Sequence, residues 1–255
     1  MALANMHIHS SYSWDSKMKL TDVAETLIKN KVFYAGIADH VEFDRVKPEM
    51  NLINLQYRNE EIDKLNDKYK GKIKLLKGVE ISEPHLYKRE VEKLSVLNLD
   101  FIMGSIHQII RNPNNNLQKR EYTRIYYDEM LNMVKANQID ILGHIDYINR
   151  YYNGDYSDYK QISEILYAMR ENNIVLELNS SSKRRSCKQL AFPDIDKLSM
   201  YKYYGKYVTV GTDAHQVNEL LDNLDQTEYL ANMYDLKQVI FKKRKMKELE
   251  PPTYS

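Results

Sequence analysis

Imidazole and carboxylate side chains recur along this chain at spacings that suit metal binding. His7 and His9 are two residues apart, and so are Asp213 and His215. Residues i and i+2 at the end of a strand point to the same side, so each pair can reach one metal centre. Four motifs of similar composition lie between these pairs, and each follows an apolar stretch: Asp39-His40, Gly78-Val79-Glu80, Ser105-Ile106-His107 and Gly143-His144-Ile145-Asp146.

The number of these residues favours a metal cluster over isolated structural histidines. One histidine at a strand end is most often a hydrogen-bonded structural residue. Here six of the seven histidines occupy such positions, together with two carboxylates: His7, His9, His40, His107, His144, His215, Glu80 and Asp213. Imidazole and carboxylate ligands without thiolates suit zinc, manganese or iron, and eight ligands are more than one ion binds. The sequence therefore predicts two to three divalent metal ions.

The elements that must position these residues are short apolar strands alternating with helical patterns. The expected strands end at His9 and span 34–38, 73–79, 99–106, 139–142, 174–178 and 207–210, and helical patterns follow them, for example over 121–136 and 195–204. Seven β-then-α units without an antiparallel hairpin signal predict a parallel sheet covered by helices.

The placement of the candidate residues narrows the α/β fold class further. All of them follow the carboxyl ends of strands, where barrels and doubly wound sheets build their sites. A closed barrel brings seven strand ends to one mouth, whereas an open sheet spreads them along an edge. The pattern therefore favours a distorted (β/α)7 barrel with the metal cluster at the C-terminal ends of its strands, and residues 1–255, which contain no Pro/Gly/Ser-rich linker, are expected to form one catalytic domain.

Charge and composition exclude several classes of partner. Lysine and arginine total 37 against 36 aspartate and glutamate residues, so no global basic field predicts binding to nucleic acid or to an anionic membrane. The basic segment Phe241-Lys242-Lys243-Arg244-Lys245 is interpreted as a solvated end. No run reaches the roughly 18 apolar residues of a membrane span, and the segment before His7 is too short for a signal peptide, so we expect a cytoplasmic protein. The only cysteine, Cys187, is expected to have no role.

Taken together, the motifs resemble the polymerase and histidinol phosphatase (PHP) family of metallophosphoesterases. The resemblance runs from His7-Ile8-His9 to Asp213-Ala214-His215 and so covers nearly the whole chain. Within that family, the segments Gly104-Ser105-Ile106-His107, Leu142-Gly143-His144-Ile145-Asp146 and Glu177-Leu178-Asn179 are most similar to stand-alone histidinol-phosphate phosphatases. Members of the family have a distorted (β/α)7 barrel, which agrees with the seven expected strands.

The resemblance also implies a distribution of ligands over three ions. One ion would be held by His7, His9, Glu80 and Asp213. A second would share Glu80 as a bridging carboxylate and add His107 and His144, and a third would take His40 and His215. Many relatives place a histidine in the loop after His9, where this chain has Asp15. Asp15 is accordingly expected as a further ligand, with a turn-capping aspartate as the alternative.

The expected chemistry is hydrolysis of a phosphate monoester by water activated between the two ions that share Glu80. Asp213 or His215 could protonate the leaving alkoxide. Three arginines past the fifth and sixth strands, Arg150, Arg184 and Arg185, could grip the phosphate with guanidinium forks, with solvated surface arginines as the alternative. The candidates for phosphate binding also include Ser105.

The resemblance implies L-histidinol phosphate as the substrate, which places the enzyme in histidine biosynthesis. The alternatives are a PHP nuclease or a phosphatase for another small phosphate ester or nucleotide, and a non-catalytic metal-binding module. The near-neutral charge disfavours the nuclease, and the full set of ligands disfavours the non-catalytic module. The sequence leaves open the oligomeric state and the role of His85, which is either a surface loop residue or a substrate contact.

Overall fold

Seven parallel strands form the centre of the protein and close on themselves. The computed structural model describes residues 4–45, 48–111, 118–150, 158–182, 184 and 192–249. The strands follow one another in the order β1-β2-β4-β5-β6-β7-β8, and each pairs in parallel with the next. A parallel bridge between Ile8 and Ala214 joins the first strand to the last, and the backbone N–H of His9 donates to the carbonyl of Ala214 at 2.9 Å. The expected barrel is therefore confirmed.

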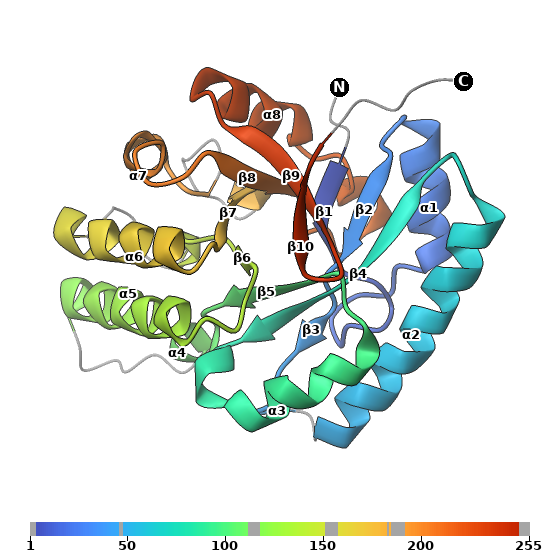
Figure 1. Cartoon of the computed structure of the whole chain (residues 1–255), viewed down its shortest axis with the longest axis horizontal. Coiled ribbons are helices and arrows are strands. Elements are labelled where there is room, and N and C mark those ends of the chain that lie inside the picture. Colours follow the sequence, from blue (N-terminus) through green and yellow to red (C-terminus); the bar gives the residue numbers. More distant parts are fainter. Residues whose placement is uncertain are drawn as a thin grey trace.

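These seven strands are β1 Ala4–Ile8, β2 Tyr34–Ile37, β4 Lys74–Ser82, β5 Phe101–Ser105, β6 Ile141–Leu142, β7 Val175–Asn179 and β8 Tyr207–Gly211. The helices are α1 Leu20–Lys29, α2 Pro48–Lys68, α3 Lys88–Lys93, α4 Gln108–Arg111, α5 Lys119–Ala136, α6 Tyr159–Glu171, α7 Ile195–Tyr201 and α8 Leu224–Met233, with 3-10 turns η1 Pro84–Leu86, η2 Leu94–Leu97, η3 Tyr147–Arg150, η4 Ser180–Ser182 and η5 Val217–Glu219. Figure 1 shows the helices arranged around the outside of the strands. Among the described residues no helix is both long and apolar enough to cross a bilayer.

Three strands were not expected from the sequence. The short β3, His40–Val41, pairs in parallel with β4. The other two, β9 Lys237–Lys242 and β10 Lys245–Glu248, form an antiparallel hairpin beside β8. The prediction of a topology without an antiparallel hairpin was therefore wrong. Its turn residues, Lys243 and Arg244, both adopt positive φ without a glycine or asparagine to signal the turn.

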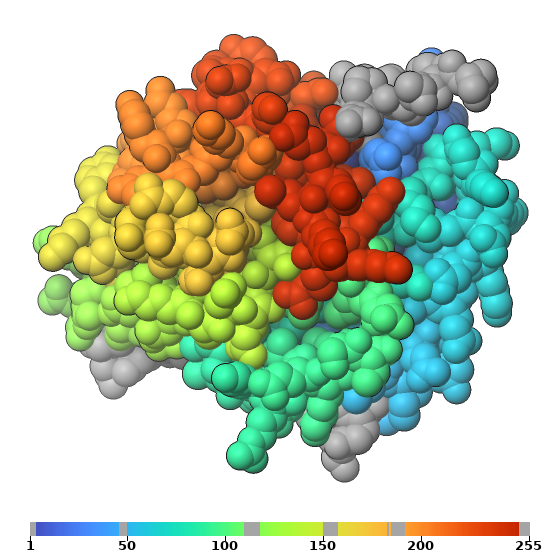
Figure 2. Space-filling model, viewed as in Figure 1, coloured from blue at the N-terminus to red at the C-terminus, as the bar shows by residue number. Residues whose placement is uncertain are grey.

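The hairpin closes the end of the barrel opposite the predicted metal cluster. Its turn reaches the N-terminal ends of β5 and β6, where the backbone N–H of Arg244 donates to the carbonyl of Asp100 at 2.9 Å and its guanidinium pairs with Asp140. Val239 and Phe241 are buried with interior residues of the barrel. Figure 2 shows that the hairpin, in red, covers the centre of this face. The basic segment thus forms the turn of a hairpin, and its four basic residues, Lys242 to Lys245, are exposed, as expected of a solvated segment.

A bulge in β1 explains how two histidines reach the site from one strand. Ala4 and Met6 pack inside the barrel, whereas Ile8 packs outside it against residues of α1. The register between β1 and β2 shifts between Asn5 and Ile8, and a bulge of this kind re-aims the side chains that follow it. The shift turns His7 and His9 toward the mouth of the barrel, where both side chains are fully buried.

Candidate metal centre

The predicted ligands gather at the C-terminal ends of the strands, as expected. Glu80 lies near the end of β4, and His9, His107, His144 and Asp213 follow β1, β5, β6 and β8 closely. His40 opens β3 and pairs in register with Glu80 on β4. Among the described residues, four groups of three potential ligands, one of which includes the unpredicted Glu42, have atoms within 4.8 Å of one another: His7/His9/Asp213, His7/Glu80/His144, His9/His40/His215 and His40/Glu42/His107.

The two carboxylate oxygens of Glu80 face different histidines. Oε2 lies 3.0 Å from His40 Nδ1 and 3.5 Å from Nε2 of both His7 and His9. Oε1 lies 2.8 Å from His144 Nε2 and 3.5 Å from His107 Nε2. The side chain is 1% exposed, so these contacts account for most of its surroundings. A carboxylate with one oxygen in each histidine group has the geometry of a bridging ligand.

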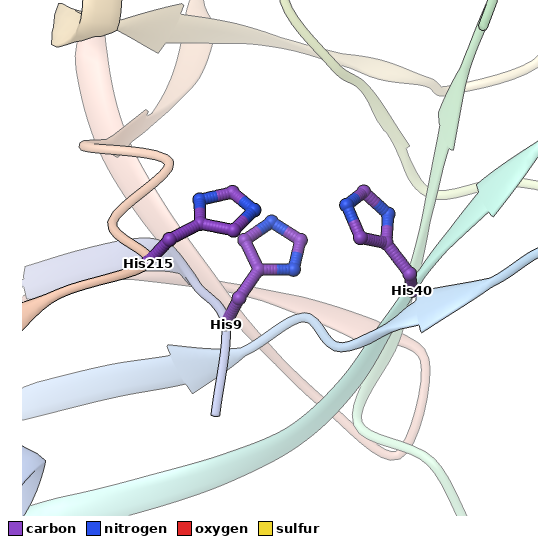
Figure 3. A group of neighbouring side chains, drawn as sticks. All are labelled: His9, His40 and His215. Carbon is purple, nitrogen blue, oxygen red and sulfur yellow. The ribbon is translucent and has the colours of Figure 1, made fainter. Parts of the chain in front are cut away.

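A second group lies beside the first, around His215 and Asp15. The ring centroid of His9 is 4.2 Å from that of His215 and 4.3 Å from that of His40, and Figure 3 shows the three rings, from three separate segments, gathered in one place. Asp15 Oδ2 lies 3.1 Å from His215 Nε2 and 3.4 Å from His40 Nε2. Asp213 Oδ1 lies 3.2 Å from His9 Nε2 and links this group to the first.

The donor atoms suit metal binding because most histidines are already held through their other nitrogen. Nδ1 of His7 lies 2.7 Å from Glu177, Nδ1 of His9 lies 3.2 Å from Ser13 Oγ, and Nδ1 of His215 lies 3.0 Å from the carbonyl of Asp213. His107 Nδ1 lies 3.6 Å from Glu42. Each contact leaves Nε2 for the cluster, which is the arrangement that metal-binding histidines adopt.

Two atoms of the cluster, one from Glu80 and one from His40, face each other without forming a hydrogen bond. Within the described part of the chain, Glu80 Oε2 and His40 Nδ1 are buried without a hydrogen-bond partner, although they lie 3.0 Å apart. Buried polar atoms normally find a hydrogen bond. Two ligands bound to one ion at about 2.1 Å lie roughly 3–3.5 Å from each other, which matches this distance. These residues therefore fit divalent metal ions.

The electrostatics of the site keep its carboxylates ionised. Burial opposes charge on Glu80, but the surrounding histidines, His7 first among them, outweigh it and hold its pKa well below the usual range. Burial opposes protonation of His40, yet Glu80 and Asp15 raise its pKa to about 10. For His9, burial and the neighbouring imidazoles act together and hold its pKa well below the usual range. Ionised carboxylates bind metals, and protons compete with metal for His40.

Glu177 is a residue of the site for which no role was predicted. Its Oε1 binds His7 Nδ1, and its Oε2 accepts hydrogen bonds from the backbone N–H of His144 at 2.8 Å and from Asn179 Nδ2 at 3.1 Å. The neighbouring strand leaves room for this side chain only because residue 211 is glycine, since a Cβ there would lie 2.4 Å from Glu177 Oε1. A charged residue inside the apolar strand Val175–Asn179 was the available signal.

Two further acidic residues hold the backbone around the ligands. Asp39 accepts hydrogen bonds from the backbone N–H of Ser10 at 2.5 Å and from the hydroxyl of Ser13 at 3.1 Å, and it pairs with the fully buried Arg58 of α2. Glu83, which adopts a left-handed φ of 44°, accepts from the backbone N–H of His107 at 2.6 Å. The motif Asp39-His40 thus combines a loop anchor with a ligand.

The predicted phosphate-binding residues are only partly described. Arg185 and the side chain of Arg150 lie outside the described residues, as does Cys187. Arg184 Nη2 donates to the backbone carbonyls of Thr212 at 2.6 Å and Asp213 at 3.0 Å. Thus Arg184 lies beside the strand end that carries two ligands.

Two other residues singled out by the sequence have clear partners. The buried hydroxyl of Ser105 donates to Glu80 Oε1 at 2.5 Å, which places it beside the bridging carboxylate. His85 Nε2 lies 2.8 Å from Glu129 Oε2 on α5, and the His85 side chain is 8% exposed. His85 is therefore a largely buried residue that ties η1 to α5 rather than an exposed loop residue.

Comparisons with known proteins agree with this geometry. The PHP domain family matches residues 5–181. A protein of Clostridium acetobutylicum named "Probable histidinol-phosphatase" is 30% identical, with 94% of this chain and 97% of that protein covered. A histidinol-phosphatase of Lactococcus lactis is 28% identical over 84% of this chain and 85% of its own length.

A solved structure extends the agreement to the fold. The crystal structure of histidinol phosphate phosphatase from Lactococcus lactis, complexed with zinc, L-histidinol and phosphate, superposes with a TM-score of 0.79 over 96% of this chain and 98% of that one, at 22% identity. A similarity at this identity supports the barrel architecture.

Proposed function

The chain belongs to the PHP domain family, and we propose that it is a metal-dependent phosphomonoesterase that converts L-histidinol phosphate to L-histidinol and inorganic phosphate. The substrate is inferred from the relatives named histidinol-phosphatase, which match this chain along most of its length. The activity places the protein in histidine biosynthesis, and its partner is a small phosphate ester rather than a nucleic acid or a membrane.

The observation that carries the proposal is the position of Glu80 between two groups of histidines. His7 and His9 on one side, and His107 and His144 on the other, meet its two oxygens. Bound divalent ions would lower the pKa of water and offset the charge that develops on phosphorus. Glu80 would bind ions on both sides, and Ser105 holds the carboxylate in place through a 2.5 Å hydrogen bond.

We propose that either Asp213 or His215 delivers the proton to the leaving alkoxide. The two side chains are close, with His215 Nδ1 3.7 Å from Asp213 Oδ1, and His215 is 17% exposed whereas Asp213 is 3% exposed. Burial opposes protonation of His215, but Asp15 and Asp213 outweigh it and raise its pKa above the usual value. A general acid must carry the proton that it donates, so His215 can take this role only in a state in which it does not bind an ion.

We further propose that Arg150, Arg184 and Arg185 bind the phosphate from the side opposite the metals. All three follow β6 or β7, which are neighbours in the barrel. Arg184 lies beside the strand end that carries Asp213, because it donates to the carbonyl of that residue. Its guanidinium also pairs with Glu219 at 3.6 Å and with Asp222 at 3.4 Å, so binding of phosphate requires that Arg184 exchange one of these carboxylates for the substrate. Guanidinium groups bind phosphate oxygens bidentately, and metal ions alone would supply less directional recognition.

The proposed cofactors are two to three divalent ions, Zn, Mn or Fe, held by His7, His9, Asp15, His40, Glu80, His107, His144, Asp213 and His215. Elemental analysis of the purified protein should find two to three transition-metal ions per chain. At most one ion per chain, together with activity that survives chelators, would contradict the cluster.

A phosphate-release screen over a panel of phosphorylated metabolites tests the substrate. Histidinol phosphate should give the highest kcat/KM, and a chelator should abolish turnover until Mn or Zn is restored. Faster release from another ester would move the protein to a different phosphatase specificity, and cleavage of oligonucleotides would indicate a nuclease. A protein that binds metal yet releases phosphate from neither p-nitrophenyl phosphate nor any panel member would be a binding module.

A further inference from the structure

The only tryptophan of the chain, Trp14, lies exposed at the edge of the metal centre. Its side chain is 58% exposed. Its ring is stacked toward the ring of His40, with centroids 6.1 Å apart and planes 26° from parallel. His40 in turn contacts Glu80 and Asp15, so the indole is one ring away from the predicted ligands. An aromatic ring in this place needs an explanation, because burying it would be more favourable.

The backbone on both sides of Trp14 is built into the site. Ser13, before it, accepts a hydrogen bond from the backbone N–H of His40 at 2.9 Å and donates to Asp39 at 3.1 Å. Asp15, after it, lies 3.1 Å from His215 Nε2. The hydroxyl of Ser16 donates to the carbonyls of His9 and His215. The loop around Trp14 is therefore held by polar contacts of Ser13, Asp15 and Ser16.

The planar guanidinium of Arg45 packs over the ring of Trp14. The guanidinium carbon of Arg45 lies 4.9 Å from the ring centroid, and Arg45 Nε pairs with Glu42 at 3.2 Å. Tryptophan is the aromatic residue best suited to such a contact, and flat rings that carry nitrogen stack on it in the same way. The contact with Arg45 shows that the indole can pack against a flat group that contains nitrogen.

We propose that Trp14 is the recognition surface for the leaving group of the substrate, which stacks its nitrogen heteroaromatic ring on the indole while its phosphate lies at the metal centre. The proposal rests on the function proposed above and names a residue that recognises the imidazole of L-histidinol phosphate. It predicts that the enzyme distinguishes esters with a flat ring from aliphatic amino-alcohol phosphates through Trp14.

The first test uses the fluorescence of this single tryptophan in the zinc-loaded protein. Titration with L-histidinol should change the emission intensity and wavelength with saturation. L-Alaninol, which has the amino alcohol but no ring, and inorganic phosphate should each leave the spectrum nearly unchanged. Saturable binding of L-histidinol, followed by calorimetry, without a change in emission would overturn the proposal.

The second test compares substrates in variants of Trp14. Trp14→Ala should lower kcat/KM for histidinol phosphate about three- to thirtyfold, the range of a lost stacking contact, and Trp14→Phe should restore part of the loss. The same variants should change kcat/KM for an aliphatic amino-alcohol phosphate less than about twofold if only stacking is lost. An equal loss for both substrates, or no loss for either, would refute the stacking role.

A matched control comes from another exposed aromatic residue next to a cation. Tyr203 is 76% exposed, and Lys202 Nζ lies 5.3 Å from its ring centroid. It lies between α7 and β8, away from the loop that carries Trp14. Tyr203→Ala should therefore keep the wild-type ratio of the two substrates. If the wild type does not hydrolyse histidinol phosphate, the proposed function fails, whereas hydrolysis that is indifferent to Trp14 refutes this inference alone.

Discussion

Replacing Glu177 by glutamine should weaken metal binding without changing the shape of the site. Glu177 is fully buried and accepts three hydrogen bonds, from His7 Nδ1, the backbone N–H of His144 and Asn179 Nδ2, at 2.7, 2.8 and 3.1 Å. A carboxylate can accept on both oxygens, but an amide has only one acceptor oxygen and a donating NH2 group. The three donors can therefore no longer all be satisfied.

Either orientation of the new amide has a cost. If its NH2 faces His144, the buried backbone N–H there loses its acceptor, which costs about 1–3 kcal/mol. If its NH2 faces His7, the imidazole must accept at Nδ1 and carry its proton on Nε2, the atom that faces Glu80 and Asp213. A protonated Nε2 cannot bind a metal ion. We expect a 10- to 100-fold loss of metal affinity, about 1.4–2.7 kcal/mol, typical of losing such a partner of a ligand.

The assay is a competition titration of zinc against a chromophoric chelator, with kcat/KM measured at saturating metal. The matched control is Glu171→Gln, because Glu171 is 54% exposed and its side chain pairs only with Arg170 among the described residues. The control should bind zinc like the wild type. If the Glu177→Gln variant bound every ion with wild-type affinity and kept wild-type activity, Glu177 would not orient His7.

Four further changes test other parts of the structure. Glu80→Gln should be the most damaging single ligand change, and elemental analysis should show the loss of more than one ion, because a bridging carboxylate serves two. Arg184→Ala should lower kcat/KM about 10- to 1,000-fold, as for a lost charge-assisted contact; unchanged metal content would support phosphate binding, whereas loss of metal would show that Arg184 holds Asp213. Burial and the charge of Asp146 raise the pKa of Asp194 from 3.8 to about 6, so the stability it contributes is complete below pH 3.8 and is lost as the pH rises through 6. Chelator-treated wild type should therefore lose about 1–3 kcal/mol relative to Asp194→Asn between about pH 4 and pH 7 in urea unfolding. Lys243→Gly should stabilise the C-terminal hairpin by about 0.5–1 kcal/mol in the same assay, because Lys243 has a φ of 50° that glycine adopts freely.

The parts of the fold that could be predicted are those with a local signal. The seven barrel strands end in motifs that combine apolar runs with histidine or carboxylate, and both features are visible in a short window. The C-terminal hairpin has no such signal, because its turn is Lys243-Arg244 rather than a glycine or asparagine pair. Its turn is held by distant partners, Asp100 and Asp140, which no local pattern reveals.

The site was predicted in the same uneven way. Ligands stand in motifs, whereas the residues that orient them lie on other elements. In the sequence, Arg58 stands among the polar residues of a helix, yet in the structure it is fully buried against Asp39. Glu177 reads as one charge in an apolar strand. Its role depends on β8 lying beside β7, with glycine opposite it at residue 211.

Register decides which of the predicted ligands meet. His40 and Glu80 are direct partners across β3 and β4, and this pairing places His40 Nδ1 3.0 Å from Glu80 Oε2. A shift of one residue would turn one of the two side chains to the other face of the sheet, because side chains alternate along a strand. Likewise, His7 and His9 face inward together with Glu80 because the bulge in β1 changes the direction of their side chains. The spacing of residues along the chain therefore predicts which residues are ligands, but strand pairing determines how these ligands are divided among the ions.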